Sequence, residues 1–164
     1  MNVQLPDYEY RGARALVLLH EKHLREFVSV WRRAHAAGIA LPETKDPSYA
    51  SLETLLHHVL RAARGYMTWI CESLALDDPK IGDPPPLERI AGEAGACLEH
   101  VLERWRTPLA AVPEERFEDK AYPSRWGVPF CIDAMLEHAV MHPIRHAFQL
   151  ENLLAAREAS RRSG

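Results

Sequence analysis

Hydrophobic residues recur every three or four positions along four stretches of the chain, 8–37, 51–76, 87–111 and 130–156. This spacing places them on one face of an α-helix, and no pair of segments alternates as paired strands would. The pattern therefore predicts an all-α fold, a four-helix bundle in one domain over 1–164. The expected inward faces include Leu24, Phe27 and Trp31; Leu55, Val59 and Tyr66; Leu98, Leu102 and Trp105; and Leu136, Leu150 and Leu153.

Proline and serine mark the boundaries of these helices. Ser48 or Ser51 is expected to cap the second helix. The linker over 76–86 contains Pro79 and the Pro84-Pro-Pro86 run, which exclude a helix there. About ten extended residues reach about 30 Å, the length of a 20-residue helix, so the linker can return along the bundle. The second and third helices are therefore expected to be parallel.

The connection over 112–129 is long for a compact domain, and such loops are usually functional or disordered. Its aromatic residues Phe117, Tyr122 and Trp126 predict an ordered loop that acts as a lid or an interface element. The tail over 157–164 is expected to be frayed and solvated.

Charge, hydropathy and cysteine content argue against a nucleic-acid-binding, membrane or secreted protein. The net charge of −3, with both signs interspersed, gives no basic surface for nucleic acid or an anionic membrane. No apolar run approaches the length of a membrane span, and the N-terminus lacks the apolar core of a signal peptide. Cys71, Cys97 and Cys131 are odd in number and lack a Cys-x-x-Cys spacing, which is typical of a reducing cytoplasm.

The nine histidines carry the candidate chemistry. His142 and His146 both fall in the apolar face of the last helix, about 6 Å apart along its axis, which suits two ligands of one metal ion. His138 extends the series, but the outer two are about 12 Å apart, so the pair is 138/142 or 142/146. The second pair is better directed at the interior. The alternative is a pair of core histidines satisfied by hydrogen bonds.

Pro143 lies between the two inward histidines and predicts a kink or bulge at the site. The alternative is that the helix ends near Met141. The apolar face resumes through Leu150 and Leu153, which favours a continuous helix.

A third ligand has to come from another helix, and His58 is the best-placed candidate. Neighbouring His57 points about 100° away from it and is expected at the surface. Ala62 and Gly65 on the side of His58 leave room for a pocket, with Trp69 as an aromatic wall. Three neutral imidazoles with an open position are typical of a catalytic metal site.

Four further residues are assigned supporting roles. Tyr66 and Trp69 are expected to form pocket walls. Gln149 is expected to orient a metal-binding histidine without contacting the metal itself. His20 and His23 lie on the apolar face of the first helix. His20 is expected to be a core histidine with local hydrogen bonds, and His23 a candidate outer contact of the metal site or a pocket wall.

Three motifs together resemble the DinB/YfiT-like family of metalloenzymes. They are Leu55-Leu-His-His-Val-Leu-x-Ala-Ala, His142-x-x-x-His146-x-x-Gln149 and the Trp126-Gly-x-Pro129 sequence before the last helix. The resemblance implies a bundle of up-down-down-up topology, usually dimeric, with a divalent metal held by one histidine of the second helix and two of the last. Those positions are His58, His142 and His146 here. Family members often have His-Arg-Gly-Gln where this chain has His146-Ala-Phe-Gln149.

The resemblance also implies an activity. Some members are similar to transferases and isomerases that use bacillithiol or mycothiol. We therefore expect a cytoplasmic homodimer that acts on a small molecule with a divalent metal and a low-molecular-weight thiol. Zinc or nickel is the first expectation for the metal, and iron, cobalt or manganese are alternatives. No catalytic residue is assigned.

Two alternative functions stay open. A metal-dependent hydrolase needs a carboxylate base, but Asp133 and Glu137 are expected on the outer side of the last helix and Glu151 points away. The non-enzymatic alternative is a dimeric stress-response or interaction bundle with structural histidines.

Overall fold

Helices make up most of the chain in the computed structural model, which describes residues 5–118 and 120–162. The all-α prediction is confirmed. In chain order the elements are α1 (Arg11–Ala36), the 3-10 turn η1 (Pro47–Tyr49), α2 (Leu52–Leu74), α3 (Leu87–Trp105), α4 (Glu115–Glu118), β1 (Tyr122–Pro123), β2 (Pro129–Phe130) and α5 (Ile132–Arg162).

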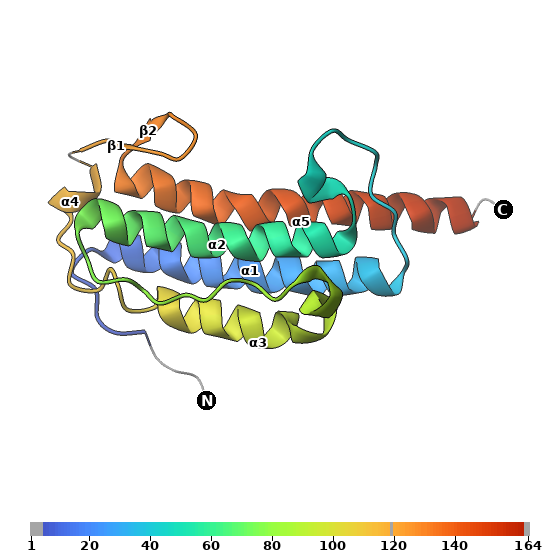
Figure 1. Ribbon diagram of the computed structural model, residues 1–164, viewed down its shortest axis with the longest axis horizontal. Coiled ribbons are helices and arrows are strands. Elements are labelled where there is room, and N and C mark those ends of the chain that lie inside the picture. Colours follow the sequence, from blue (N-terminus) through green and yellow to red (C-terminus); the bar gives the residue numbers. More distant parts are fainter. Residues whose placement is uncertain (1–4, 119, 163–164) are drawn as a thin grey trace.

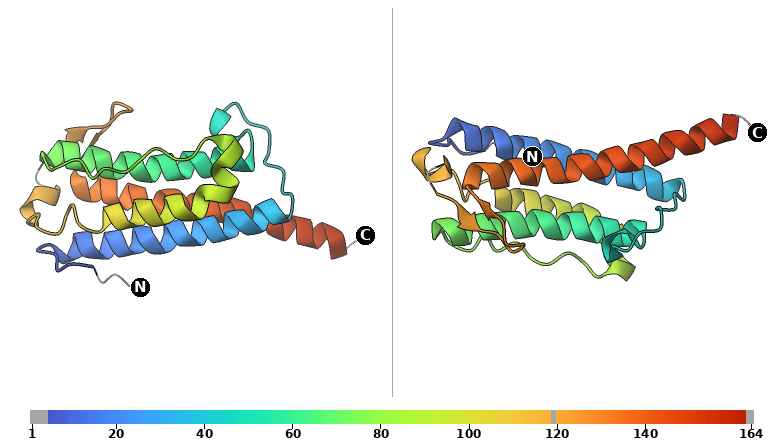
Figure 2. Two further views of the ribbon diagram at one scale, coloured as in Figure 1. Left: turned by 60° about the horizontal axis from the view of Figure 1, so that its bottom comes forward. Right: turned by 90° about the horizontal axis from the view of Figure 1, so that it is seen from above.

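The four long helices lie side by side (Figure 1). Helices α1 and α5 run in one direction, and α2 and α3 run in the opposite direction. The proline-rich linker returns along α2 before α3 begins, as its length predicts. Both views in Figure 2 show the end of α5 extending beyond the other helices. No helix in the described part of the chain is both long and apolar enough to cross a membrane.

The helices enclose one hydrophobic core in which buried indoles find backbone acceptors. Trp31 Nε1 donates a hydrogen bond to the carbonyl oxygen of Leu52 at 2.6 Å. Trp105 Nε1 donates to the carbonyl oxygen of Ala63 at 3.0 Å. Each bond joins two helices and satisfies a polar group that would otherwise be costly to bury, so these side chains stabilise a defined packing.

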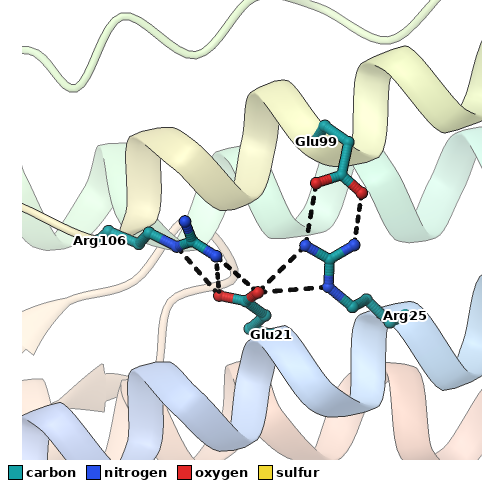
Figure 3. Close-up of polar contacts among 4 residues, drawn as sticks. All are labelled: Glu21, Arg25, Glu99 and Arg106. Atoms are coloured by element: carbon teal, nitrogen blue, oxygen red, sulfur yellow. Dashed lines mark hydrogen bonds and ion pairs between the residues drawn. The ribbon is translucent and has the colours of Figure 1, made fainter. Parts of the chain in front are cut away.

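A charged network joins α1 to α3 at the edge of this core (Figure 3). Arg106 donates from Nη2 to Glu21 Oε1 at 2.7 Å and from Nε to Glu21 Oε2 at 3.1 Å. Arg25 bridges Glu21 and Glu99, with 2.9 Å between its Nη2 and Glu99 Oε2. Glu21 is partly shielded from water, and its pKa is lowered by the two guanidinium groups against the opposing effect of burial.

Two predicted helix boundaries are wrong. Helix α3 ends at Trp105 and not at 111, because Pro108 has no N–H and disfavours a helical conformation at Thr107. Helix α5 does not fray at 157 but continues to Arg162. Arg157 Nη1 anchors this extension by donating to the carbonyl oxygen of Gly38 at 2.9 Å. Residues 163–164 of the expected tail lie outside the described residues.

The absence of strand pairing is a further wrong prediction. Tyr122 pairs with Phe130 and Pro123 with Pro129 in a short antiparallel hairpin. A turn with Gly127 at φ +83° closes it. Strands of two residues each are too short for alternation to be visible in the sequence. The hairpin gives order to the long loop before α5, as its aromatic residues predict.

Candidate metal centre

Three histidine side chains from two helices converge inside the bundle. They are His58 of α2 and His142 and His146 of α5, and one ring nitrogen from each lies within 4.8 Å of the other two. Nε2 of His58 and Nε2 of His142 are 3.0 Å apart. No other group of three metal-ligating side chains is this close within the residues that the structure describes. The structure thus brings together the three histidines that the helix faces predicted.

Local helix geometry places the pair on α5. His142 and His146 are separated by four residues and therefore project from the same face, with ring centroids 4.7 Å apart. Pro143 is buried between them, and α5 continues through it without interruption. The alternative that the helix ends near Met141 is therefore wrong. Pro143 cannot donate to the carbonyl of Ala139, a loss that the surrounding packing has to offset.

The second helix settles the choice between adjacent histidines. Ser51 begins α2 with a capping box, in which its side chain accepts from the N–H of Thr54 and its own N–H donates to the Thr54 hydroxyl. Burial of the apolar face of α2 sets the rotation of the helix, so that His58 Nε2 lies 3.0 Å from His142 Nε2 of α5. His57 is half-buried and does not join the group.

The spacing of the nitrogens fits a metal ion. Nitrogen ligands lie about 2.0–2.1 Å from zinc, which puts two of them about 3.3 Å apart in tetrahedral coordination. The 3.0 Å separation of the His58 and His142 nitrogens is close to this value. The three histidines can therefore hold a metal ion.

Burial keeps these imidazoles in the neutral form that binds metals. It lowers the pKa of His142 to about 2, and the neighbouring histidines and Arg145 act in the same direction. It lowers the pKa of His146 to about 4, although the hydrogen bond to Gln149 opposes the shift. The pKa of His58 is also lowered, first by burial. A metal ion would not have to displace protons from them near neutral pH.

Two residues contact Nδ1 of His146, the ring nitrogen that is not assigned to the metal. Its Nδ1 is 3.1 Å from Gln149 Oε1, which can only accept, so Nδ1 carries the proton and Nε2 is left as a ligand. The Tyr49 hydroxyl, from η1, lies 3.5 Å from the same Nδ1. Gln149 occupies its predicted position. Tyr49 was not predicted, because nothing in the sequence relates a loop residue to a histidine 97 positions away.

A pocket of about 280 Å³ opens beside His58 and His142. Tyr66 and Trp69 line it, as expected, and Gly65 leaves space between them. Trp126 from the hairpin loop forms a further wall. Trp69 Nε1 donates to the carbonyl oxygen of Pro123 at 3.0 Å and ties the hairpin to α2. The loop before α5 therefore forms part of the pocket.

Two charged residues at this pocket were not predicted. Arg61 of α2 and Arg125 of the hairpin loop both line it. Arg61 lies one helical turn after His58, which is a local signal that could have identified it. Arg125 depends on how the loop folds over α2, and its sequence position gives no such signal. No carboxylate is among the described residues that line the pocket.

The structure does not bring the other histidines into the group of three. His23 Nδ1 pairs with Glu26 Oε2 at 2.7 Å and lines a different hollow, with Ile144 and Phe148. His138 packs against the Trp126 ring, with centroids 5.6 Å apart. Neither is placed to contact a metal ion held by the three histidines.

His20 is buried in the core as predicted, but the expected local hydrogen bonds are wrong. Its ring stacks on Trp105 with centroids 3.7 Å apart. Neither ring nitrogen has a hydrogen-bond partner among the described residues. Burial lowers the pKa of His20 to about 3, so the ring is neutral near pH 7.

Comparison with known proteins identifies no relative: no family model, no curated protein and no solved structure matches the chain.

Proposed function

We propose that this protein is a divalent-metal-dependent enzyme whose ligands are His58, His142 and His146. One observation carries the proposal: ring nitrogens of three imidazoles from two helices converge within 4.8 Å, and two of these histidines, His58 and His142, line a pocket. Two of the nitrogens lie 3.0 Å apart, which suits either a hydrogen bond between neutral imidazoles or two ligands of one ion, and the adjoining pocket offers space that a small molecule can fill.

The proposed reaction is the transfer or isomerisation of a substrate that reacts with a low-molecular-weight thiol. A divalent ion in a three-imidazole site supplies a Lewis acid with open positions, which lowers the pKa of a thiol or water that binds there. The chain itself supplies Gln149, whose carbonyl oxygen fixes the tautomer of His146, and Tyr66 and Trp69, which form part of the pocket wall. Because no described carboxylate lines the pocket to act as a base, thiol chemistry is favoured over hydrolysis.

Helix directions support a relationship to the DinB/YfiT-like family. Helices α1 and α5 run one way and α2 and α3 the other, which corresponds to up-down-down-up in chain order (Figure 1). We propose zinc or nickel as the metal, because imidazole nitrogen suits both. Free thiols at Cys71, Cys97 and Cys131 agree with a reducing cytoplasm as its location.

A homodimer is proposed from an exposed apolar stripe on α5. Met141, Ile144 and Phe148 follow one another at helical spacing, and Met141 and Phe148 are 48% and 62% exposed. Apolar side chains gathered on one helix face are typical of an interface. Light scattering of the wild type and of Phe148→Asp tests this, with a dimer expected for the first and a monomer for the second.

Elemental analysis of protein prepared without a histidine tag tests the metal site. We expect near-stoichiometric metal in the wild type and none in His58→Ala or His142→Ala. His57→Ala is the matched control, because it removes the adjacent histidine of the same helix and should leave the metal in place. Unchanged metal content in His142→Ala would refute the ligand assignment. A screen of thiols with small electrophiles then tests the reaction, and turnover without any thiol would contradict the transferase proposal.

A further inference from the structure

Positive charge gathers at the mouth of the pocket beside the histidines. Arg61 approaches from α2 and Arg125 from the hairpin loop, so two elements distant in the sequence each supply a guanidinium group. The Arg125 group reaches across α2: a Cβ placed on Gly65 would lie 4.0 Å from its Nη1.

These pocket arginines lack the partners that several other arginines have. Arg25, Arg89 and Arg106 each form an ion pair with a glutamate. Neither Arg61 nor Arg125 forms one with any residue that the structure describes, and the pocket has no described carboxylate in its wall. The whole chain carries a net charge of −3, so this local excess of positive charge runs against the overall balance.

The rest of the pocket wall is apolar and aromatic. Tyr66, Trp69 and Met135 are buried, and Trp126 is half-exposed at the rim. Flat aromatic rings and a thioether suit an apolar or aromatic body. The volume of about 280 Å³ suits a molecule at or below the lower end of the drug-size range.

We propose that the pocket binds a small organic carboxylate with an apolar or aromatic body. Arg125 and Arg61 hold the carboxylate, because the planar guanidinium group matches its two oxygens, and the aromatic wall holds the body beside the three histidines. The inference names the substrate class for the proposed function and rests on it for the reaction. The binding itself depends only on the pocket and can be measured without a metal.

Titration of metal-free protein with 4-phenylbutyrate and its uncharged analogue 4-phenylbutanol, followed by tryptophan fluorescence, tests the proposal. Metal-free protein is used so that the carboxylate cannot bind an ion at the histidines. We expect the acid to bind about tenfold more tightly than the alcohol, as a charge-assisted hydrogen bond predicts. Arg125→Gln and Arg61→Gln should each remove most of this preference and leave the affinity for the alcohol unchanged.

Arg33→Gln is the matched control, an arginine that lines the hollow on the other side of α5. It should keep the full preference for the acid. Equal affinity for acid and alcohol in the wild type would overturn the proposal. It would also be overturned if Arg33→Gln lost as much of the preference for the acid as Arg61→Gln and Arg125→Gln, because the preference would then reflect the overall charge of the protein. Metal binding is measured separately, so protein that prefers the acid but takes up no metal would support the carboxylate pocket and refute the metal function alone.

Discussion

Buried histidines occupy two different environments in this molecule. His142 and His146 lie on the face of α5 where His58 meets them from α2, and a pocket adjoins the group. His20 lies on the buried face of α1, stacked on Trp105, with no partner for either ring nitrogen. All are buried or half-buried, and burial lowers the pKa of each.

This comparison shows which feature of a buried histidine indicates function. A position on an apolar helix face predicts burial equally for His20 and for His146. Among the described residues, His58, His142 and His146 alone form a group of three histidines from two helices, and a pocket adjoins that group. Burying an imidazole nitrogen without a hydrogen-bond partner lowers the stability of the folded state by about 1–3 kcal/mol. His20 therefore stabilises the fold through the packing of its ring and not through its nitrogens.

The sharpest test of the comparison is the removal of one histidine from each environment. We expect His142→Ala to abolish the metal-dependent rise in melting temperature, and His20→Leu to keep it. A ligand at one hundred times its dissociation constant stabilises a protein by about 2.7 kcal/mol, which gives a clear shift in the wild type. Melting curves with and without zinc provide the measurement. Loss of the shift in both variants would show that the two environments are not distinct.

Acidification should destabilise the metal-free protein. The folded-state pKa values are lowered to about 3 for His20, 2 for His142 and 4 for His146, whereas the unfolded chain titrates near its ordinary value of about 6.5. The unfolded state therefore binds more protons below that value, and stability falls as the pH decreases toward 4. At pH 5 the loss is about 2 kcal/mol for each of the three histidines. Urea unfolding at pH 7.5 and pH 5 in the presence of a chelator measures it, and equal stability at both would contradict the expectation.

A smaller effect is expected at the residue behind the metal site. Gln149→Ala removes the acceptor that holds the Nδ1 proton of His146, and partners of this kind typically change metal affinity by at least about tenfold. Competition with a chromogenic chelator measures the affinity. Asn152→Ala, an exposed change three residues along the same helix, is the control and should bind metal like the wild type. Equal affinity in Gln149→Ala would mean that Tyr49 alone orients the ring.

The smallest effect is expected from the isolated histidine. His20→Leu removes two unsatisfied nitrogens and keeps an apolar side chain of similar size, so the free energy of unfolding at pH 7 should rise by about 1 kcal/mol. The gain should be larger at pH 5, where the wild type is weakened by the protonation of His20 in the unfolded chain. Urea unfolding of the two proteins provides the comparison. A less stable variant at both pH values would show that the stack on Trp105 outweighs the unsatisfied nitrogens.

Local rules allowed much of the fold to be predicted from the sequence. The cap at Ser51, the prolines of the linker and the period of the apolar residues act over a few neighbouring positions, so the four long helices were visible in the chain itself. The same geometry put His142 and His146 on one face and separated His58 from His57. The prediction failed where an end depends on distant contacts, as at Arg157, whose bond to Gly38 prolongs α5.

Only the tertiary structure decided how these faces meet. The sequence set the direction of each histidine relative to its own helix, but the approach of α2 to α5 placed three ring nitrogens within 4.8 Å. Tyr49 and Arg125 reach the site from loops, whose paths follow from packing and not from periodicity. His20 has the same local pattern as the clustered histidines and lacks a partner only because no polar group of another helix lies opposite it. Partners across a core depend on the positions of whole helices, which local patterns do not determine.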